Sequence, residues 1–261
     1  MIPKCIHYCW FGRKPLPEFA KRCIASWRKY MPDYEILEWN EDNFDITMFQ
    51  YTYEAYNKKK FAFVSDVARF WILYHHGGIY FDVDVELLKP LTEVVSNGPY
   101  MGLEQDNTLV KGIFTGADLG VACNPGLGMA ASAGMPFCKE MLSLYKSLRF
   151  CFPSGAINTK TVVSYTSELL LEKGYDVSLN GPQECGGFVI YPKAYFCPTI
   201  HKDKGSIELM PETISVHHYA ATWVDGKMRF KGHISRVLAR LLPTPILKAV
   251  RAGYRWVLRK K

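Results

Sequence analysis

The chain has 261 residues, of which 48% are hydrophobic and 14% aromatic, enough to bury a sizeable core in one large α/β domain or two small ones. This composition excludes an intrinsically disordered chain. The formal net charge of +7 is concentrated at the C-terminus, because residues 225–261 hold eleven Lys and Arg against one Asp. No groove-reading module accompanies these basic residues, so nucleic-acid binding is not expected.

The cysteines and the apolar segments indicate the compartment. Eight cysteines occur without a Cys-x-x-Cys pair or a Cys/His spacing typical of a metal site, which predicts free thiols in a reducing cytosol. The sequence opens without the apolar core of a secretory signal and has no uninterrupted apolar run of about 18 residues. We therefore expect a cytoplasmic protein without a membrane-spanning helix.

The start of the sequence predicts a β-α-β unit. Lys4–Cys9 is expected as a buried strand and Tyr34–Trp39 as a second strand, while Glu18–Tyr30 carries apolar residues at helical spacing. A right-handed crossover places the ligand-binding edge at the carboxyl ends of the strands. Trp10 follows the first strand and falls at this edge.

A second helix is expected from Ser65 to about His76. Ser65 is a suitable N-cap, and the two glycines that follow His76 suit a left-handed stop. Asp66 and Arg69 lie three residues apart on this helix, so they share a face and can point at one ligand. An ion pair within the helix is the alternative.

A short strand, Ile79–Phe81, leads into the sequence Asp82-Val83-Asp84. Two carboxylates one residue apart suit a hard divalent cation such as Mg²⁺ or Mn²⁺, which takes oxygen ligands from the protein and from the phosphates of a substrate. Solvated turns also contain Asp-x-Asp. A phosphohydrolase with Asp82 as its nucleophile is a further alternative, but such enzymes usually carry Thr or Val where this chain has Glu86.

The middle of the chain is expected to alternate loops with helices. Glycine-rich composition predicts loops, and helical spacing of apolar residues predicts helices. The expected elements are loops at Gly112–Gly128 and Asn180–Phe188, helices at Leu127–Leu148 (broken near 134–136) and Thr161–Lys173, and a strand at Val189–Tyr195.

Two motifs together resemble a known family. The stretch SDVARFWILYHHGGIYFDVDV, Ser65–Val85, resembles the signature of glycosyltransferase family 32, which contains a sugar-binding DXD region. The opening IPKCIHYCWFG, Ile2–Gly12, resembles the first strand of that family, and the motifs occur in the family's order. The resemblance implies an α/β GT-A fold, a single Rossmann-like sandwich that binds a nucleotide-sugar and transfers the sugar with retention at its anomeric carbon.

The resemblance also implies roles for residues near these motifs. Trp10 would stack on the nucleotide base, although a core tryptophan is the alternative. Asp66 and Arg69 would contact the donor sugar and its ribose or phosphate side, and Asp82 would hold ribose and sugar hydroxyls. Asp84 would bind the metal directly. Asp66, Arg69 and Asp82 are thus the expected catalytic residues.

Near the C-terminus, the stretch HHYAATW, residues 217–223, resembles the closing element of the family, where a metal ligand precedes a tryptophan that covers the donor. His218 would be this ligand, with His217 the competing candidate and a purely structural histidine the alternative. Imidazole suits Mn²⁺ better than Mg²⁺. Tyr80 and Trp223 complete the expected donor-binding residues.

The implied reaction is metal-dependent transfer of a hexose to a saccharide or lipid-linked saccharide acceptor in surface or capsular polysaccharide synthesis. UDP-galactose and UDP-glucose are the leading donors. A divalent cation and Arg69 would stabilise the charge of the departing diphosphate. A non-catalytic, lectin-like sugar-nucleotide-binding protein is the alternative, but it would not need Asp84 together with Arg69.

The last residues, 231–261, are expected to form a basic amphipathic tail after a glycosyltransferase domain at 1–230. Apolar side chains alternate there with Arg and Lys, and Pro243 and Pro245 interrupt the pattern. Such helices lie on anionic membranes, which would place the enzyme on the cytoplasmic membrane face. A final helix pair packed on the domain is the alternative.

Overall fold

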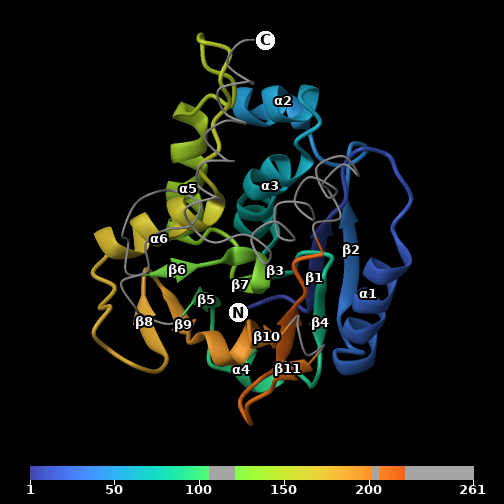
Figure 1. Cartoon of the computed structure of the whole chain (residues 1–261), viewed down its shortest axis with the longest axis vertical. Coiled ribbons are helices and arrows are strands. Elements are labelled where there is room, and N and C mark those ends of the chain that lie inside the picture. Colours follow the sequence, from blue (N-terminus) through green and yellow to red (C-terminus); the bar gives the residue numbers. More distant parts are fainter. Residues whose placement is uncertain (106–120, 202–205, 221–261) are drawn as a thin grey trace, which may run out of the picture. The chain divides into compact units, whose positions relative to one another are not determined.

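The computed structural model describes residues 1–105, 121–201 and 206–220. Within these ranges the main sheet has eight strands, in the order β2-β1-β3-β7-β5-β9-β8 with β6 paired to β5 (Figure 1). The bounds are β1 Cys5–Cys9, β2 Glu35–Trp39, β3 Gly78–Tyr80, β5 Tyr100–Gln105, β6 Ala122–Cys123, β7 Met129–Ala131, β8 Gln183–Cys185 and β9 Phe188–Tyr191. The predicted α/β class is confirmed.

The strand directions define one functional edge of the sheet. Strands β1, β2 and β3 are mutually parallel, and β7 is antiparallel to both β3 and β5. Strand β5 therefore runs parallel to β3, and β9 is parallel to β5. The carboxyl ends of these strands meet at the same edge, which is where open α/β sheets bind ligands.

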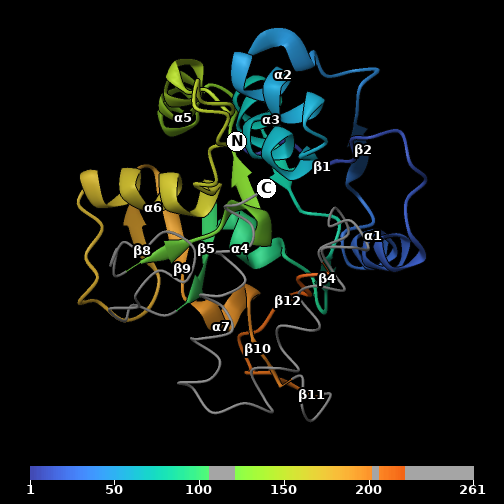
Figure 2. The same cartoon turned by 45° about the horizontal axis from the view of Figure 1, so that its top comes forward.

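Helices cover both faces of the sheet. Helix α1 packs beside β4 (Val85–Leu87), and α3 packs against α2 and α5, as Figure 1 shows. Helix α6 lies next to β6 (Figure 2). The bounds are α1 Glu18–Tyr30, α2 Gln50–Asn57, α3 Phe61–His76, α4 Thr92–Ser96, α5 Pro136–Ser147, α6 Val162–Glu172 and α7 Lys193–Phe196, with 3₁₀ turns η1 Ile46–Met48 and η2 Pro125–Leu127.

The alternation of side chains along β3 separates two apolar clusters. Tyr80 faces a cluster that contains Phe70 of α3, whereas Ile79 and Phe81 face the cluster that contains Trp27 of α1. Successive residues of a strand point to opposite faces, so one short strand contributes to both cores. The apolar run before Asp82 is therefore buried on both sides, and this fixes where the acidic residues leave the sheet.

The predicted β-α-β unit at the start of the chain is confirmed. Helix α1 begins and ends at the predicted residues, and its buried side chains are Ala20, Cys23, Ile24 and Trp27. Their spacing of three and four residues is that of one helix face. The indole of Trp27 also donates a hydrogen bond to the Val85 carbonyl oxygen at 2.8 Å, which joins α1 to the segment after the acidic motif.

The predicted start of the second helix is wrong. Helix α3 begins at Phe61, and Ser65 lies inside it, where its hydroxyl donates to the Phe61 carbonyl oxygen at 3.3 Å. The helix gains a turn because Val64 is fully buried and Phe61 and Phe63 pack against the same cluster. The helix ends as predicted at Gly77, whose φ of 66° suits glycine.

Several predictions for the middle of the chain need correction. Only Pro136–Ser147 of the stretch predicted as a broken helix is helical, because Met129–Ala131 forms β7 between β3 and β5. The loop predicted at 180–188 contains β8, which pairs with β9, and the following strand ends at Tyr191 before Pro192. The helix predicted at 161–173 is confirmed as α6.

Two strand pairs lie outside the main sheet in the described ranges. Two-stranded pairs are formed by β4 (Val85–Leu87) with β12 (Ser215–His217) and by β10 (Thr199–His201) with β11 (Ser206–Glu208). In the described ranges, no helix is both long and apolar enough to cross a bilayer. Trp223 and the predicted tail at 231–261 lie outside the described residues.

Candidate metal and sugar-nucleotide site

The acidic motif forms a turn at the carboxyl end of β3. The Asp82 amide donates to the Gly126 carbonyl oxygen at 3.2 Å, and the Val85 amide donates back to the Asp82 carbonyl oxygen at 3.0 Å. Strand β4 then starts at Val85. This turn presents Asp82 and Asp84 at the ligand-binding edge, as the sequence predicts.

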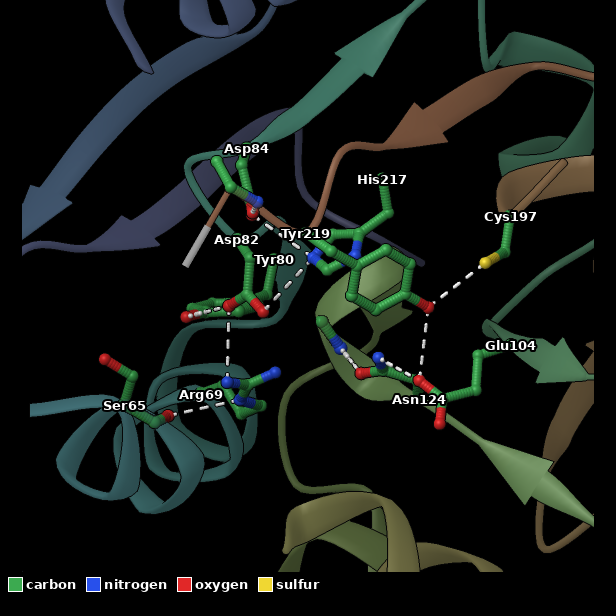
Figure 3. A network of polar contacts seen from close by, with 12 residues as sticks. Ser65, Arg69, Tyr80, Asp82, Asp84, Glu104, Asn124, Cys197, His217 and Tyr219 are labelled. Atoms are coloured by element: carbon green, nitrogen blue, oxygen red, sulfur yellow. Dashed lines mark hydrogen bonds and ion pairs between the residues drawn. The ribbon is translucent and has the colours of Figure 1, made fainter. Parts of the chain in front are cut away.

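Pairing of two distant strands brings a histidine to the two carboxylates. Strand β12 is antiparallel to β4, with His217 opposite Val85. The His217 Nε2 atom lies 3.1 Å from Asp84 Oδ1 and 3.9 Å from Asp82 Oδ2. Asp82, Asp84 and His217 each offer one ligand atom to a group in which all these atoms lie within 4.8 Å of one another. Figure 3 shows the three side chains converging.

The residues present fit a divalent cation. Both ring nitrogens of His217 are buried and make no hydrogen bond of good geometry within the described part of the chain. Asp84 is 8% exposed and His217 6% exposed. Two carboxylate oxygens and one imidazole nitrogen are a donor set that suits Mn²⁺. Burial of unpartnered polar atoms is costly unless a ligand satisfies them.

Electrostatics in this group favour the charged carboxylate. Burial opposes ionisation of Asp84, but the contact with His217 and the hydrogen bond from the Ala220 amide outweigh it, so the Asp84 pKa lies below its ordinary value. Burial likewise opposes a charge on His217, yet Asp84 and Asp82 outweigh it and raise the His217 pKa. The pocket therefore attracts positive charge.

The geometry favours His217 over His218 as the metal-facing residue. The His218 Nε2 atom lies 2.8 Å from Glu86 Oε2, and its ring stands edge-on to Phe19 with 5.0 Å between centroids. Consecutive residues of an extended chain point to opposite sides, so only one of the two histidines can face Asp84. The preference for His218 that the family resemblance suggested is therefore corrected.

Arg69 lies between Asp66, which is on the same helix α3, and the acidic motif. Its Nη2 atom is 3.0 Å from Asp66 Oδ1 and 3.2 Å from Asp82 Oδ1, and its side chain is 3% exposed. The guanidinium carbon lies 4.8 Å from the ring centroid of Tyr80, whose hydroxyl donates to Asp82 Oδ1 at 3.0 Å. The intrahelical ion pair and the orientation towards Asp82 thus occur together.

This ion pair leaves one buried donor unused. The Nη1 atom of Arg69 has no hydrogen-bond partner among the described residues. Burial opposes the charge of Arg69, but Asp82, Tyr80 and Asp66 outweigh it and raise its pKa, so the guanidinium stays charged. Burial raises the pKa of Asp66 to about 7, with Arg69 opposing that rise. Arg69 is therefore ready to donate to an anionic ligand.

Trp10 lies partly buried at the predicted edge. Its indole N–H donates to the Lys14 carbonyl oxygen at 2.6 Å, and its ring packs against the core cluster of α1. Trp223, the other expected aromatic residue, lies outside the described residues.

Sequence reasoning missed a polar wall next to the acidic motif. Asn124 accepts a hydrogen bond from the Gly126 amide at 2.7 Å and donates one to Glu104 at 2.9 Å. A Cβ atom at Gly126 would lie 2.1 Å from Asp82 Oδ2, so only glycine fits there. The Asn-Pro-Gly sequence is a turn signal that could have indicated Asn124, whereas no local signal indicates Glu104.

Comparison with known proteins agrees with this geometry. Residues 17–101 match the family described as "Glycosyltransferase sugar-binding region containing DXD motif". This match confirms the resemblance seen in the sequence over these residues, which are about a third of the chain. The match includes Asp66, Arg69, Asp82 and Asp84 but ends before β12.

Named relatives are similar over part of their length. Inositol phosphoceramide mannosyltransferase 1 of Schizosaccharomyces pombe is 30% identical over 111 residues, which are 38% of this chain and 33% of the relative. Inositol phosphoceramide mannosyltransferase 3 of that organism is 36% identical over 92 residues, 32% and 24% of the two chains. A glycosyltransferase of Acanthamoeba polyphaga mimivirus is 32% identical over 121 residues, 44% and 47%. The chain thus spans a third or less of the two mannosyltransferases.

Two solved glycosyltransferases show a weak structural likeness. The PaToxG glycosyltransferase has a TM-score of 0.41 at 20% identity, covering 55% of this chain and 60% of its own. A glycosyltransferase involved in glycosylation of the major capsid of PBCV-1 has a TM-score of 0.43 at 11% identity, covering 82% and 93%. The architecture described above rests on its own strand order.

Proposed function

We propose that the protein is a GT-A type, metal-dependent glycosyltransferase that moves a hexose from a nucleotide-sugar donor to a hydroxyl of a saccharide or lipid-linked saccharide. One observation carries the proposal. Ligand atoms of Asp82, Asp84 and the buried His217 converge within 4.8 Å, and neither imidazole nitrogen makes a hydrogen bond of good geometry among the described residues, next to an unpartnered Arg69 donor. The match of residues 17–101 to the DXD-containing family supports it.

The charges of the site match a nucleoside diphosphate leaving group. A divalent cation held by Asp84, His217 and Asp82 would supply Lewis-acid stabilisation of the departing diphosphate. Arg69 would donate its free N–H to the same developing charge, and its bond to Asp66 would hold the guanidinium in place. Asp82, which accepts from Tyr80, would orient ribose or sugar hydroxyls. Retention at the anomeric carbon is part of the proposal.

The donor and acceptor are proposed by class. UDP-galactose and UDP-glucose are the leading donors, with Trp10 as the surface for the base. The relatives named inositol phosphoceramide mannosyltransferases add a mannose nucleotide and an inositol-bearing phospholipid acceptor to the candidates. We further propose a catalytic domain at 1–230 and peripheral attachment to the cytoplasmic membrane face through 231–261, with a role in surface polysaccharide synthesis.

The test is a screen of nucleotide-sugars for hydrolysis without acceptor. We expect one donor to be hydrolysed with Mn²⁺, no hydrolysis after chelation, and recovery when Mn²⁺ is restored. The variant Asp84→Ala should lose at least 100-fold in turnover, about 2.7 kcal/mol of transition-state stabilisation. Exposed Glu140→Gln, whose carboxylate pairs with Lys173, is the control.

The outcomes separate the candidate functions. Tight binding of a nucleotide-sugar without turnover in any condition would indicate a binding protein. Release of phosphate from a phosphomonoester, abolished by Asp82→Asn, would indicate a phosphohydrolase. Full hydrolysis of a nucleotide-sugar by chelated protein would contradict the metal assignment while leaving the transferase class in place.

A further inference from the structure

Glu104 lies at the same edge of the sheet as the acidic motif. It is the penultimate residue of β5, and β5 runs parallel to β3, so both strands deliver their carboxyl ends to this edge. Figure 3 shows the ring of Tyr219 between His217 and Glu104. The metal-facing group and Glu104 therefore form two sides of one site, and the function proposed above assigns no role to Glu104.

Two donors hold the Glu104 carboxylate by a single oxygen. Asn124 Nδ2 lies 2.9 Å from Oε2, and the Tyr219 hydroxyl lies 3.2 Å from the same atom. The other oxygen, Oε1, has no hydrogen-bond partner in the part of the chain that the structure describes. The carboxylate is thus fixed in orientation while one oxygen stays available to a ligand.

The positions of these donors are tied to the metal-facing residues. Asn124 accepts from the Gly126 amide, and the Gly126 carbonyl oxygen accepts from the Asp82 amide. On the other side, Tyr219 stands edge-on to His217 with 4.2 Å between ring centroids. Two separate chain segments therefore hold Glu104 in a fixed relation to Asp82 and His217.

The backbone around Tyr219 shows that this arrangement is strongly specified. Tyr219 has a φ of 49°, a conformation that costs energy for a residue with a bulky side chain. Asp84 accepts hydrogen bonds from the residues on either side of Tyr219. The His218 amide donates to the Asp84 carbonyl oxygen at 3.0 Å, and the Ala220 amide donates to Asp84 Oδ2 at 2.8 Å. The same segment thus presents His217 to the acidic motif and the Tyr219 hydroxyl to Glu104.

The chemistry of Glu104 selects the kind of ligand group. A carboxylate accepts hydrogen bonds and repels phosphate oxygens, so its partner must carry a donor. Burial raises the pKa of Glu104, whereas the bonds from Asn124 and Tyr219 oppose the rise, so an additional donor would stabilise the ionised form. A hexose presents several hydroxyl donors around its ring.

We propose that Glu104 is a substrate-binding residue whose Oε1 atom accepts a hydrogen bond from a sugar hydroxyl, with Asn124 and Tyr219 as its positioning residues. This inference rests on the proposed glycosyltransferase function. The hydroxyl belongs either to the transferred sugar or to the acceptor, and these sources give the same hydrogen bond. Glu104 lies outside the possible ligand group found among the described residues, which comprises Asp82, Asp84 and His217.

The test compares Glu104→Gln with wild type in acceptor-free hydrolysis, in transfer, and in calorimetry. The substitution keeps the size of the side chain and one acceptor oxygen for Asn124 and Tyr219, but it replaces a charged acceptor by a neutral one. We expect the KM for one substrate to rise about tenfold, which corresponds to about 1.4 kcal/mol. Tyr219→Phe, which keeps the ring beside His217, should give a smaller rise in the same KM. Glu140→Gln, at an exposed position of α5, is the matched control.

The substrate affected identifies the source of the hydroxyl. A raised donor KM, with weaker calorimetric binding of the nucleotide-sugar but unchanged binding of the nucleoside diphosphate, assigns Glu104 to the transferred sugar. A raised acceptor KM with unchanged donor hydrolysis assigns it to the acceptor. Both support the inference, and a wild-type protein that binds a nucleotide-sugar without turnover contradicts only the proposed function.

Two results would overturn the inference. One is a Glu104→Gln protein with every KM and every nucleotide-sugar affinity within twofold of wild type. The other is a loss of Mn²⁺ affinity equal to that of Asp84→Ala, which would make Glu104 part of the metal site. If Glu104→Gln has a lower thermal midpoint, Tyr219→Phe supplies the comparison, because it leaves the carboxylate in place.

Discussion

At the scale of single residues, the tandem histidines show how strand geometry selects one of two chemically equal groups. His217 faces Asp84 at 3.1 Å, whereas His218 faces Glu86 at 2.8 Å on the other side of the chain. The difference comes from the period of two along an extended backbone. Neighbouring residues of the same type therefore offer a matched pair for testing the metal site.

The first residue-scale prediction uses this pair. His217→Ala should weaken Mn²⁺ binding at least tenfold, about 1.4 kcal/mol, because a direct ligand is removed from a buried site. His218→Ala should change Mn²⁺ affinity less than twofold, since its imidazole pairs with Glu86. Calorimetric titration of Mn²⁺ into each purified variant gives both values. Equal losses in the two variants, or a larger loss for His218→Ala, would show that the metal-facing assignment is wrong.

At the scale of elements, His7 joins three parts of the sheet. It lies on β1 and is 1% exposed, its Nε2 atom is 3.0 Å from the Gly77 carbonyl oxygen, and its Nδ1 atom accepts from the Trp39 indole at 3.1 Å. These partners fix the neutral tautomer with the proton on Nε2. A second proton would set an N–H against the indole N–H, and burial lowers the His7 pKa to about 4.

This arrangement predicts how stability depends on pH. Above pH 6.5 His7 is neutral in both states, so its contribution is complete. As pH falls from 6.5 towards 4, the unfolded chain binds a proton that the folded chain does not, so the free energy of unfolding falls by about 3 kcal/mol. His7→Gln should reduce this acid loss relative to wild type in urea titrations at pH 7 and 4.5. His75→Gln, at the exposed end of α3, measures the effect of removing another imidazole.

One outcome would contradict the predicted role of His7 in acid sensitivity. If wild type and His7→Gln lose the same free energy of unfolding between these pH values, other groups cause the acid sensitivity. The comparison remains valid even when His7→Gln is less stable at pH 7, because the prediction concerns the change with pH.

The elements also show which parts of the fold local sequence can predict. Helix α1 and the flanking strands follow from their own apolar periodicity, so the bounds of α1 were predicted and those of β1 and β2 were predicted to within one residue. Met129–Ala131 has no local strand signal, and its conformation comes from pairing with β3 and β5. Ser65 predicts the start of α3 because serine is a good N-cap, whereas the burial of Val64 extends the helix back to Phe61.

The candidate site likewise contains some residues that the sequence alone could bring together and others that it could not. Asp66, Arg69, Asp82 and Asp84 lie within one short stretch and one motif, so sequence alone could bring them together. His217 reaches them through the register of β12 on β4, and this pairing of distant segments fixes which histidine points inward. Glu104 comes from a strand for which the sequence predicted no element. Contacts between distant segments depend on tertiary packing, which local pattern does not encode.

At the scale of the whole molecule, the family match and the described site cover different parts of the chain. The match spans residues 17–101, whereas His217 and the Tyr219 positioning segment come from the end of the described residues. The matched residues thus include the acidic motif and Arg69. Later segments contribute His217 to the metal-facing group and contribute Asn124 and Tyr219, which hold Glu104. The basic residues at 231–261 lie C-terminal to this last site segment in the sequence, so the tail is the next part of the chain to test.

The whole-molecule prediction concerns that tail. If residues 231–261 rest on an anionic bilayer, their attraction has a Coulomb part that salt screens over about 8 Å at physiological ionic strength and an apolar part that salt does not screen. Full-length protein should float with anionic vesicles, float less with neutral ones, and be released by salt. Replacing Arg259, Lys260 and Lys261 by Gln should reduce the salt-sensitive part, and Trp256→Ala the salt-resistant part.

Truncation after Phe230 distinguishes a membrane tail from a structural one. Removing a tail that only binds membrane should abolish flotation while donor hydrolysis and the thermal midpoint of the remaining domain persist. Removing a tail packed on the domain would expose apolar surface, so the truncated protein should unfold or lose hydrolysis. That result, or full-length protein that does not float with anionic vesicles at low salt, would assign residues 231–261 to the catalytic domain and would contradict the proposed membrane attachment.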